Sequence, residues 1–212
     1  MPTQHDQSVS SVSLDQGAPR HLRLVGAGVL DLELVQTWIS TLLEQSGEEI
    51  FRMKGVLSIA HAPCRFVYHA VHMIIFNGHF DEAWGEGEAR ESKMVFISKN
   101  LDAQALAHSF NRCLATPENL LRKLDALRFA VGDEVECKTG CHKWSAGKVV
   151  GLMYRDEQMP QGMVAPYQVK LEGPDVGGHG DAEAEERLIW APADDDRCIR
   201  RARRGREHCG LN

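Results

Sequence analysis

Cysteine and histidine side chains give this sequence its first candidate chemistry, which is metal binding. Cys137, Cys141 and His142 form a C-x-x-x-C-H motif, and thiolate and imidazole groups are the ligands that Zn²⁺ prefers. A closed structural site needs four ligands, and no second ligand pair stands nearby at a matching spacing. The motif therefore predicts at most weak zinc binding. A buried Cys137 in a strand and a Cys141 in a turn are the alternative interpretation.

A second group of candidate ligands lies in the first half of the chain. His69 and His72 are three residues apart, which suits two ligands on a helix, but on a strand they would point to opposite faces. His72 could instead join His79 or Cys64 after folding. The alternative is a histidine that is hydrogen-bonded in the core or at its edge.

The sequence has none of the arrangements that are typical of enzymes. No nucleophile–base pair and no metal triad stands at a recognisable spacing. The phosphate-binding motif of nucleotide hydrolases, G-x-x-x-x-G-K-[ST], does not occur in the sequence. Gly85-Glu86-Gly87-Glu88 is rich in glycine, but its carboxylates would repel phosphate. We therefore expect a chain that is not an enzyme.

Composition and charge restrict the class of protein further. The chain has 212 residues, of which 43% are hydrophobic and 25% charged, and these values exclude collagen-like and wholly disordered proteins. A net charge of −6 argues against a membrane or nucleic-acid partner. Six cysteines without an apolar leader segment predict free thiols in a reducing compartment. We expect a cytoplasmic protein, and organelle targeting of a longer form stays open.

The first half of the chain alternates strand and helix patterns. Apolar residues recur at helical spacing from Val35 to Leu43, between a candidate N-cap at Asp31 and a stop at Gly47. A second helix is predicted behind Asp102. Strand patterns are found at residues 8–14, 50–59, 66–76 and 93–98.

The pattern changes near residue 125, where helical periodicity stops and short strand-like segments alternate with Gly, Pro and Asp. Five short strands, the number found in small barrels, are predicted at 134–138, 148–154, 167–171, 188–190 and 198–199. We therefore predict two domains. The expected organisation is a disordered start at 1–4, a first domain at 5–116, a linker at 117–127, a β-barrel at 128–200 with an acidic loop at 172–186, and a basic tail at 201–212.

Four motifs in the first half resemble the C-terminal domain of the CobW family. They are Arg52-Met53-Lys54-Gly55-Val56-Leu57, Tyr68-His69-Ala70-Val71-His72-Met73, Glu82-Ala83-Trp84-Gly85 and Ser92-Lys93-Met94-Val95-Phe96-Ile97. The resemblance covers roughly residues 4–115 and implies an α+β fold, an open sheet with helices on one face. In the family this domain normally follows a P-loop GTPase domain. Family members are GTP-dependent metal chaperones, and many of them handle zinc.

The resemblance also implies partners and a contact surface. The chain would be the non-catalytic C-terminal half of such a chaperone, without a cofactor of its own, while GTP and Mg²⁺ bind only the GTPase domain. That GTPase domain, in cis or in trans, and a metal-receiving client protein are the expected partners. Trp84, in a loop predicted at 78–92, and the cations Arg90 and Lys93 are candidate contacts. The alternatives are a tryptophan packed on its own sheet and ordinary solvated charges.

The second half resembles the small barrels of the Tudor type. The resemblance lies in Val131-Gly132-Asp133-Glu134-Val135-Glu136, Trp144-x-x-Gly147, Pro166-Tyr167-x-Val169 and Ile189-x-Ala191-Pro192. In such barrels an aromatic cage can bind a methylated side chain through cation–π attraction. The candidate cage residues are Trp144, Tyr154, Tyr167 and Trp190, with core filling as the alternative. A stand-alone binding module, whose barrel recognises a protein tail or nucleic acid, is therefore the second functional hypothesis.

Overall fold

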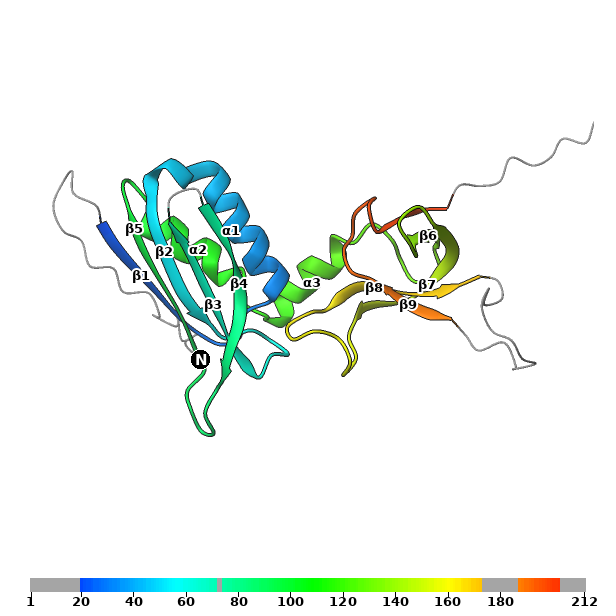
Figure 1. The fold of residues 1–212 in the computed structure, drawn as a ribbon, viewed down its shortest axis with the longest axis horizontal. Coiled ribbons are helices and arrows are strands. Elements are labelled where there is room, and N and C mark those ends of the chain that lie inside the picture. The colour runs from blue at the N-terminus through cyan, green and yellow to red at the C-terminus, as the bar shows by residue number, and fades with distance from the viewer. Residues whose placement is uncertain (1–19, 72–73, 173–186, 203–212) are drawn as a thin grey trace, which may run out of the picture. The chain divides into compact units, whose positions relative to one another are not determined.

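The computed structural model describes residues 20–71, 74–172 and 187–202, which form two compact units (Figure 1). The first unit runs to Leu120 and includes Pro160–Met163, and the second comprises Leu121–Met159 and the residues from Val164 onward. Each unit has its own antiparallel sheet, so the chain has a mixed α+β fold. Several predictions lie outside the described residues: the start at 1–4, the strand at 8–14, the ligand candidate His72, and most of the acidic loop and the basic tail.

The first unit is a five-stranded antiparallel sheet with helices on one face. The strand order is β1-β5-β2-β3-β4, and α1 and α2 lie on the same side of this sheet (Figure 1). The arrangement confirms the predicted open sheet. The elements are β1 Arg20–Ala27, α1 Leu32–Ser46, the 3-10 helix η1 Gly47–Glu49, β2 Ile50–Leu57, β3 Cys64–Val71, β4 Ile74–Ala83, β5 Glu91–Ser98 and α2 Ala103–Asn111, followed by α3 Pro117–Asp125.

The two helices that cover the sheet begin at the predicted caps. Oδ1 of Asp31 accepts a hydrogen bond of 3.0 Å from a backbone nitrogen in the first turn of α1, which satisfies one of the free N–H groups there. Asp102 caps α2 in the same way. Val35, Ile39 and Leu43 of α1 are buried one turn apart, so a single face of the helix meets the sheet.

An aromatic cluster joins the helices to the sheet of the first unit. The Trp38 ring of α1 lies 5.4 Å from the Phe110 ring of α2 and 6.4 Å from the Phe96 ring of β5, measured between ring centroids. Nε1 of Trp38 donates a hydrogen bond of 2.9 Å to the hydroxyl of Ser109. Aromatic pairs of this kind contribute about 0.5–1.5 kcal/mol each beyond the area they bury. The cluster therefore holds both helices on one face of the sheet.

Three elements differ from the predicted pattern. Strand β1 was not predicted, although Leu22 and Leu24 alternate with Arg23 and both belong to the buried apolar core. The predicted strand at 66–76 is two strands, since β3 ends at Val71 and β4 begins at Ile74. The predicted linker contains α3, which begins at Pro117. Proline suits the first position of a helix, because a backbone N–H there would have no partner within the helix.

The second unit is a five-stranded antiparallel sheet in the order β10-β6-β7-β8-β9. The strands are β6 Glu134–Lys138, β7 Trp144–Tyr154, β8 Ala165–Leu171, β9 Leu188–Ala191 and β10 Ile199–Arg201. Each of them overlaps one of the five predicted strands. Within the described residues no ladder joins β9 to β10, so the closed Tudor-type barrel stays a prediction.

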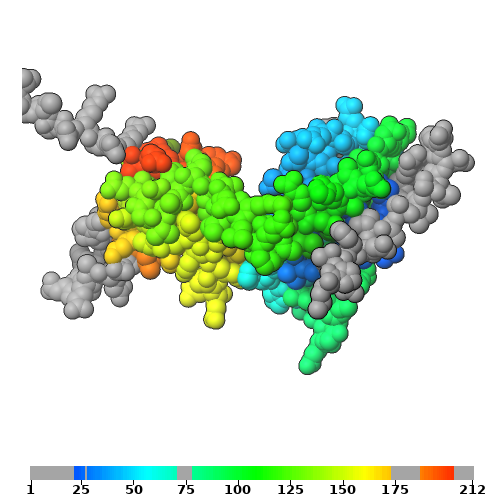
Figure 2. All heavy atoms as spheres, turned by 180° about the vertical axis from the view of Figure 1, so that it is seen from behind, coloured from blue at the N-terminus to red at the C-terminus, as the bar shows by residue number. Residues whose placement is uncertain are grey.

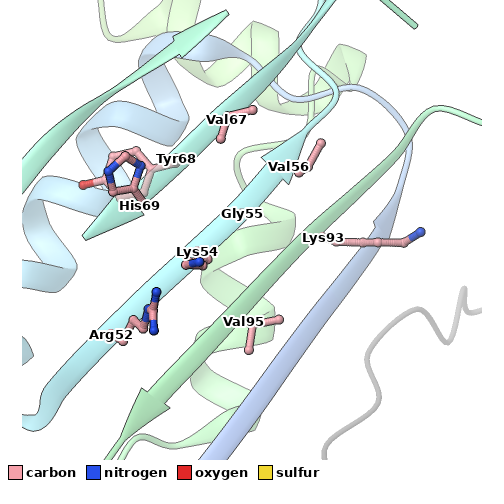
Figure 3. A pocket seen from close by; sticks show the side chains of 9 residues that line it. All are labelled: Arg52, Lys54, Gly55, Val56, Val67, Tyr68, His69, Lys93 and Val95. Carbon is pink, nitrogen blue, oxygen red and sulfur yellow. The ribbon is translucent and has the colours of Figure 1, made fainter. Parts of the chain in front are cut away.

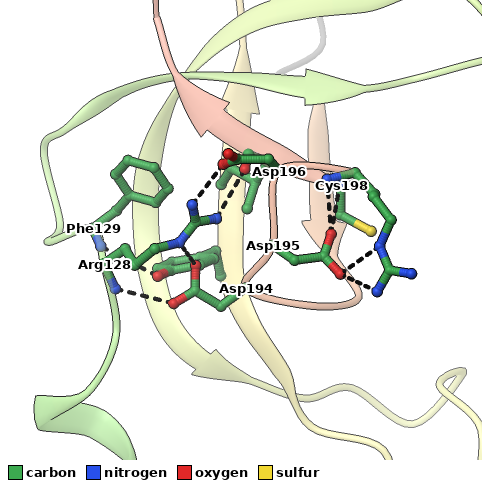
Figure 4. Close-up of polar contacts among 9 residues, drawn as sticks. Arg128, Phe129, Asp194, Asp195, Asp196 and Cys198 are labelled. Carbon is green, nitrogen blue, oxygen red and sulfur yellow. Dashed lines mark hydrogen bonds and ion pairs between the residues drawn. The ribbon is translucent and has the colours of Figure 1, made fainter.

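The ends of the second unit are tied together by Arg128. Its guanidinium forms ion pairs with Asp194 at 2.7 Å and Asp196 at 2.6 Å, and donates to the carbonyl oxygen of Ile199 at 3.1 Å (Figure 4). The hydrogen bonds that Arg128 donates to the carboxylates of Asp196 and Asp194 raise the pKa of Arg128 above its usual value. Arg128 precedes β6, and its partners lie in the segment before β10 and at the first residue of β10. These contacts therefore fasten the last strand of the second unit to its first.

Candidate functional site

The turn between β4 and β5 carries Trp84 and Arg90, two of the predicted contact residues. Strand β4 continues to Ala83, so this turn spans residues 84–90 and is shorter than the predicted loop at 78–92. It projects from the first unit in both the ribbon and the space-filling views (Figures 1 and 2). The strands on either side hold it away from the helices.

Two arginines pack against the Trp84 ring. The guanidinium carbon of Arg65 lies 5.0 Å from the ring centroid and that of Arg90 lies 5.7 Å from it. Arg65 also forms an ion pair of 2.6 Å with Glu88, which accepts a hydrogen bond of 2.7 Å from the backbone nitrogen of Gly85. The hydrogen bond from Arg65 is the main reason that the pKa of Glu88 is lowered. Trp84 is therefore half-buried in an ordered turn and packs against side chains of its own sheet and turn.

A second surface is the outer face of the first sheet, by which we mean the face turned away from α1 and α2. In β2 the side chains alternate, so that Arg52, Lys54 and Val56 are exposed while Met53 and Leu57 are buried against the helices. Strand β5 alternates in the same way. A cavity of about 580 Å³ on this face is lined by Arg52, Lys54, Gly55, Val56, Val67, Tyr68, His69, Lys93 and Val95 (Figure 3).

Three cations line this cavity. Nζ of Lys93 lies 2.9 Å from a carboxylate oxygen of Glu91. Arg52 and Lys54 have no carboxylate partner in the part of the chain that the structure describes. Of these cations, Lys93 was a candidate from the sequence, whereas Arg52 and Lys54 were not. The alternation of charged and apolar residues along β2 was the signal that could have found them.

The metal-ligand candidates of the first unit lie apart. Cys64 stands opposite Ala83 on the ladder between β3 and β4, whereas His79 stands opposite Val67. Three residues of extended strand separate the two positions, a distance on the order of 10 Å. A shared ion needs both ligands within about 2.0–2.3 Å of the metal. The described residues therefore do not bring Cys64 and His79 to one site.

The candidates of the second unit lie in different environments. Cys137 is buried in β6, and burial raises the pKa of its thiol to about 11. Because the thiolate is the form that binds zinc, this neutral thiol is a poor ligand. Cys141 and His142 are exposed in the turn between β6 and β7. Cys198, which the sequence analysis missed, interacts with Cys137 and raises the pKa of that thiol further.

We expect this chain by itself to bind zinc weakly. Across residues 20–71, 74–172 and 187–202, no three His, Cys, Asp or Glu side chains form a group that could hold a metal ion. Titration of the reduced chain with zinc, against a chelator of nanomolar affinity, should leave no stoichiometric zinc on the protein. Cys141→Ser should leave the titration unchanged. One tightly held equivalent that is lost in both Cys137→Ser and Cys141→Ser would contradict this prediction.

The four aromatic residues proposed for a cage do not converge. Tyr167 is fully buried, and its hydroxyl accepts a hydrogen bond of 3.2 Å from the backbone nitrogen of Phe129. Trp144 and Tyr154 lie at opposite ends of the 11-residue strand β7. The Trp190 side chain lies on the terminal strand β9. A cage needs several rings around one cation, so the prediction of a cage from these four residues is corrected.

The Trp144 ring already has an internal cation. The guanidinium carbon of Arg200 lies 4.0 Å from the ring centroid, and Glu136 forms an ion pair of 2.7 Å with Arg200. This contact stabilises the pairing of β6 with β10. The hypothesis of a stand-alone module that reads a methylated tail through Trp144 therefore gains no support from the structure.

Comparison with known proteins finds a family model that matches the first unit. Residues 20–114 match the family model described as the cobalamin synthesis protein cobW C-terminal domain. The match confirms, for these residues, the resemblance that the sequence motifs indicated. The Tudor-type likeness of the second unit is not confirmed.

The similar proteins include a zinc chaperone and a GTPase. The chain is 34% identical over 89 residues to the zinc chaperone CobW of Pseudomonas aeruginosa. This alignment covers 40% of this chain and 24% of the relative. It is similar to crystal structures of the zinc-bound YjiA GTPase from E. coli (26% identity, TM-score 0.42, 44% of this chain and 29% of that chain) and of a zinc-bound YjiA triple mutant (25%, 0.43, 45% and 29%). The chain thus spans about a quarter of the length of its curated relative.

Proposed function

We propose that this chain is the non-catalytic C-terminal portion of a GTP-dependent metal chaperone of the CobW type, and that it acts in partner interaction and in the regulation of metal transfer. The match of residues 20–114 to the CobW C-terminal domain carries this proposal. The zinc chaperone among its relatives supports zinc as the metal. In this role zinc is cargo and not a resident cofactor of the chain.

The partner that this proposal names first is a CobW-type GTPase domain, in cis in a longer protein or in trans. The turn at 84–90 supports the proposal, because Trp84 is ordered by Arg65, Arg90 and Glu88 before any partner arrives. An anchor that is ordered in advance loses less conformational entropy on binding. No helix in the described ranges has the length and apolar composition needed to cross a bilayer.

We expect the chain to bind a CobW-type GTPase domain with unequal affinity in its GTP and GDP states. A partner can regulate a nucleotide switch only through such a difference, which is typically about 5- to 150-fold. Calorimetric titration of the domain, loaded with a non-hydrolysable GTP analogue or with GDP, measures the ratio. Trp84→Ala should weaken the complex, and Trp190→Ala in the second unit is the matched control.

Two further measurements complete this experiment. The chain without the GTPase domain should show no saturable GTP binding, because its sequence has no phosphate-binding loop. Saturable GTP binding with turnover of GTP by the chain would contradict its assignment as non-catalytic. Equal affinities in the two nucleotide states would contradict the regulatory role, and a complex unaffected by Trp84→Ala would remove the turn at 84–90 from the interface.

A further inference from the structure

The outer face of the first sheet alternates cations with aliphatic side chains across its strands. On the ladder between β2 and β5, Lys54 lies beside Val95, and two residues further along β2 Val56 lies beside Lys93. Side chains paired across a ladder have their Cβ atoms about 4.5–5.5 Å apart. Each cation on this face therefore has an aliphatic neighbour on the next strand.

Strand β1 extends the same pattern to the edge of the sheet. Its ladder with β5 sets Arg23 beside Val95 and Val25 beside Lys93. On β2, Arg52 lies beside Ile97. The alternation thus runs over three adjacent strands, β1, β5 and β2.

This face has unused binding capacity of two kinds. Val56 and Val95 are 37% and 40% exposed, so aliphatic surface faces solvent. Arg52 and Lys54 lack carboxylate partners among the described residues, and Lys93 pairs with Glu91. The chain as a whole has a net charge of −6, so this local excess of positive charge does not follow from overall composition.

We propose that the outer face binds an acidic, aliphatic segment of a partner protein, which lies across β2 and β5 in the cavity of about 580 Å³. Charge complementarity is the basis of this proposal. Carboxylates of the segment pair with Arg52, Lys54 and Lys93, and its aliphatic side chains cover Val56 and Val95. The proposal goes beyond the function proposed above, because this binding needs neither nucleotide nor a GTPase domain.

The chemistry of the face favours a polypeptide over nucleic acid and over a membrane. Single-stranded nucleic acid stacks its bases on exposed aromatic rings, whereas the Tyr68 ring at this cavity is buried and no Phe or Trp is among the lining residues. Membrane-surface helices keep apolar and basic side chains on separate faces. Here the two kinds alternate within one face, which suits a segment that itself mixes carboxylates and aliphatic groups.

The test uses the full chain and three fluorescein-labelled ten-residue peptides. The first peptide contains equal numbers of glutamate and leucine, the second has glutamine in place of glutamate, and the third has serine in place of leucine. We expect saturable binding of the first peptide, measured by anisotropy, and about tenfold weaker binding of each of the other two. Raising the salt concentration should weaken binding of the first peptide.

Variants of the chain locate the binding site. Arg52→Glu should weaken binding of the first peptide by about tenfold or more. Arg112→Glu makes the same charge change at the end of α2, on the helical side of the sheet, and should leave the affinity unchanged. The double variant Val56→Thr with Val95→Thr keeps β-branched side chains, so it tests the aliphatic contribution without disturbing the strands. Circular dichroism confirms that each variant is folded.

Several results would overturn the proposal. Equal binding of the three peptides, or equal affinity of the Arg52→Glu and Arg112→Glu variants, would remove the outer face as their site. Saturable, Arg52-dependent binding of octanoate, of a thymidine dodecanucleotide or of phosphatidylserine vesicles would assign the face to another class of ligand. Dimerisation of the chain that Arg52→Glu abolishes would assign it to a second copy. None of these experiments contains a GTPase domain. Their results can therefore be interpreted even if the chain proves not to bind such a domain.

Discussion

Phe110→Ala is expected to lower the free energy of unfolding of the first unit by about 3–5 kcal/mol. Phe110 is fully buried, and its ring lies 5.4 Å from that of Trp38. A Cβ atom at Gly26 would lie 3.1 Å from the Phe110 ring, so the ring fills the space beside this glycine. Alanine leaves a cavity between α2 and the sheet, which the surrounding strands cannot collapse to fill.

Urea unfolding followed by tryptophan fluorescence measures this loss, since Trp38 packs directly against Phe110. Val95→Ala is the control, because Val95 is exposed on the outer face of the same sheet. The control should change the free energy of unfolding by at most about 1 kcal/mol. Equal losses in the two variants would show that the aromatic cluster does not carry the stability that we assign to it.

Gly147→Ala is expected to destabilise the second unit by about 3 kcal/mol through overpacking. A Cβ atom at Gly147 would lie 2.6 Å from the carbonyl oxygen of Lys170 and 2.8 Å from Cγ1 of Val169. The carbonyl belongs to β8, which pairs with β7 at this point. The strands must shift apart to make room for the added Cβ atom. This shift stretches or breaks ladder hydrogen bonds between β7 and β8, which lowers stability.

Hydrogen exchange of peptides from β7 and β8, read by mass spectrometry, reports this loss locally. Gly140→Ala is the matched control in the same unit, because its added Cβ would meet Cβ of Lys143 at an ordinary 3.4 Å. The control should exchange like the parent chain. Unchanged protection of β7 and β8 in Gly147→Ala would contradict the close approach of the two strands.

Together, these observations separate the scaffold of the first unit from its contact surfaces. The aromatic cluster of Trp38, Phe96 and Phe110 holds the helices on one face of the sheet. The opposite face therefore keeps its cations and valines exposed, and the turn at 84–90 projects from one end of the unit (Figure 2).

The sequence predicted those elements that depend on local interactions. Helix α1 follows from its apolar spacing and its cap, Asp31, and both signals lie within one segment of the chain. The bounds of β6 agree with the predicted 134–138, because Val135 and Cys137 alternate with charged residues. Strand β1 could not be found in this way, since its identity as a strand depends on pairing with β5, about 70 residues further along.

The local sequence pattern also could not predict that residues 66–76 divide into the two strands β3 and β4. Residues 66–76 are rich in branched and aromatic residues throughout, and a continuous strand satisfies that pattern as well as a hairpin does. Pairing between Val71 and Ile74 resolves the choice. The cage of aromatic residues failed for a related reason, because aromatic content alone does not distinguish Tyr167 in a core from a ring in a binding site.

By itself, the sequence determined which residues of a strand share a face, including Arg52, Lys54 and Val56 on β2 and Lys93 and Val95 on β5. The physical reason is that side chains of an extended chain alternate with a period of two. Only the tertiary structure decided that β2 and β5 are neighbours and that both helices cover the same side. Strand pairing depends on hydrogen bonds between segments that are distant in the chain, and burial depends on where the helices pack, so neither is encoded in any one segment.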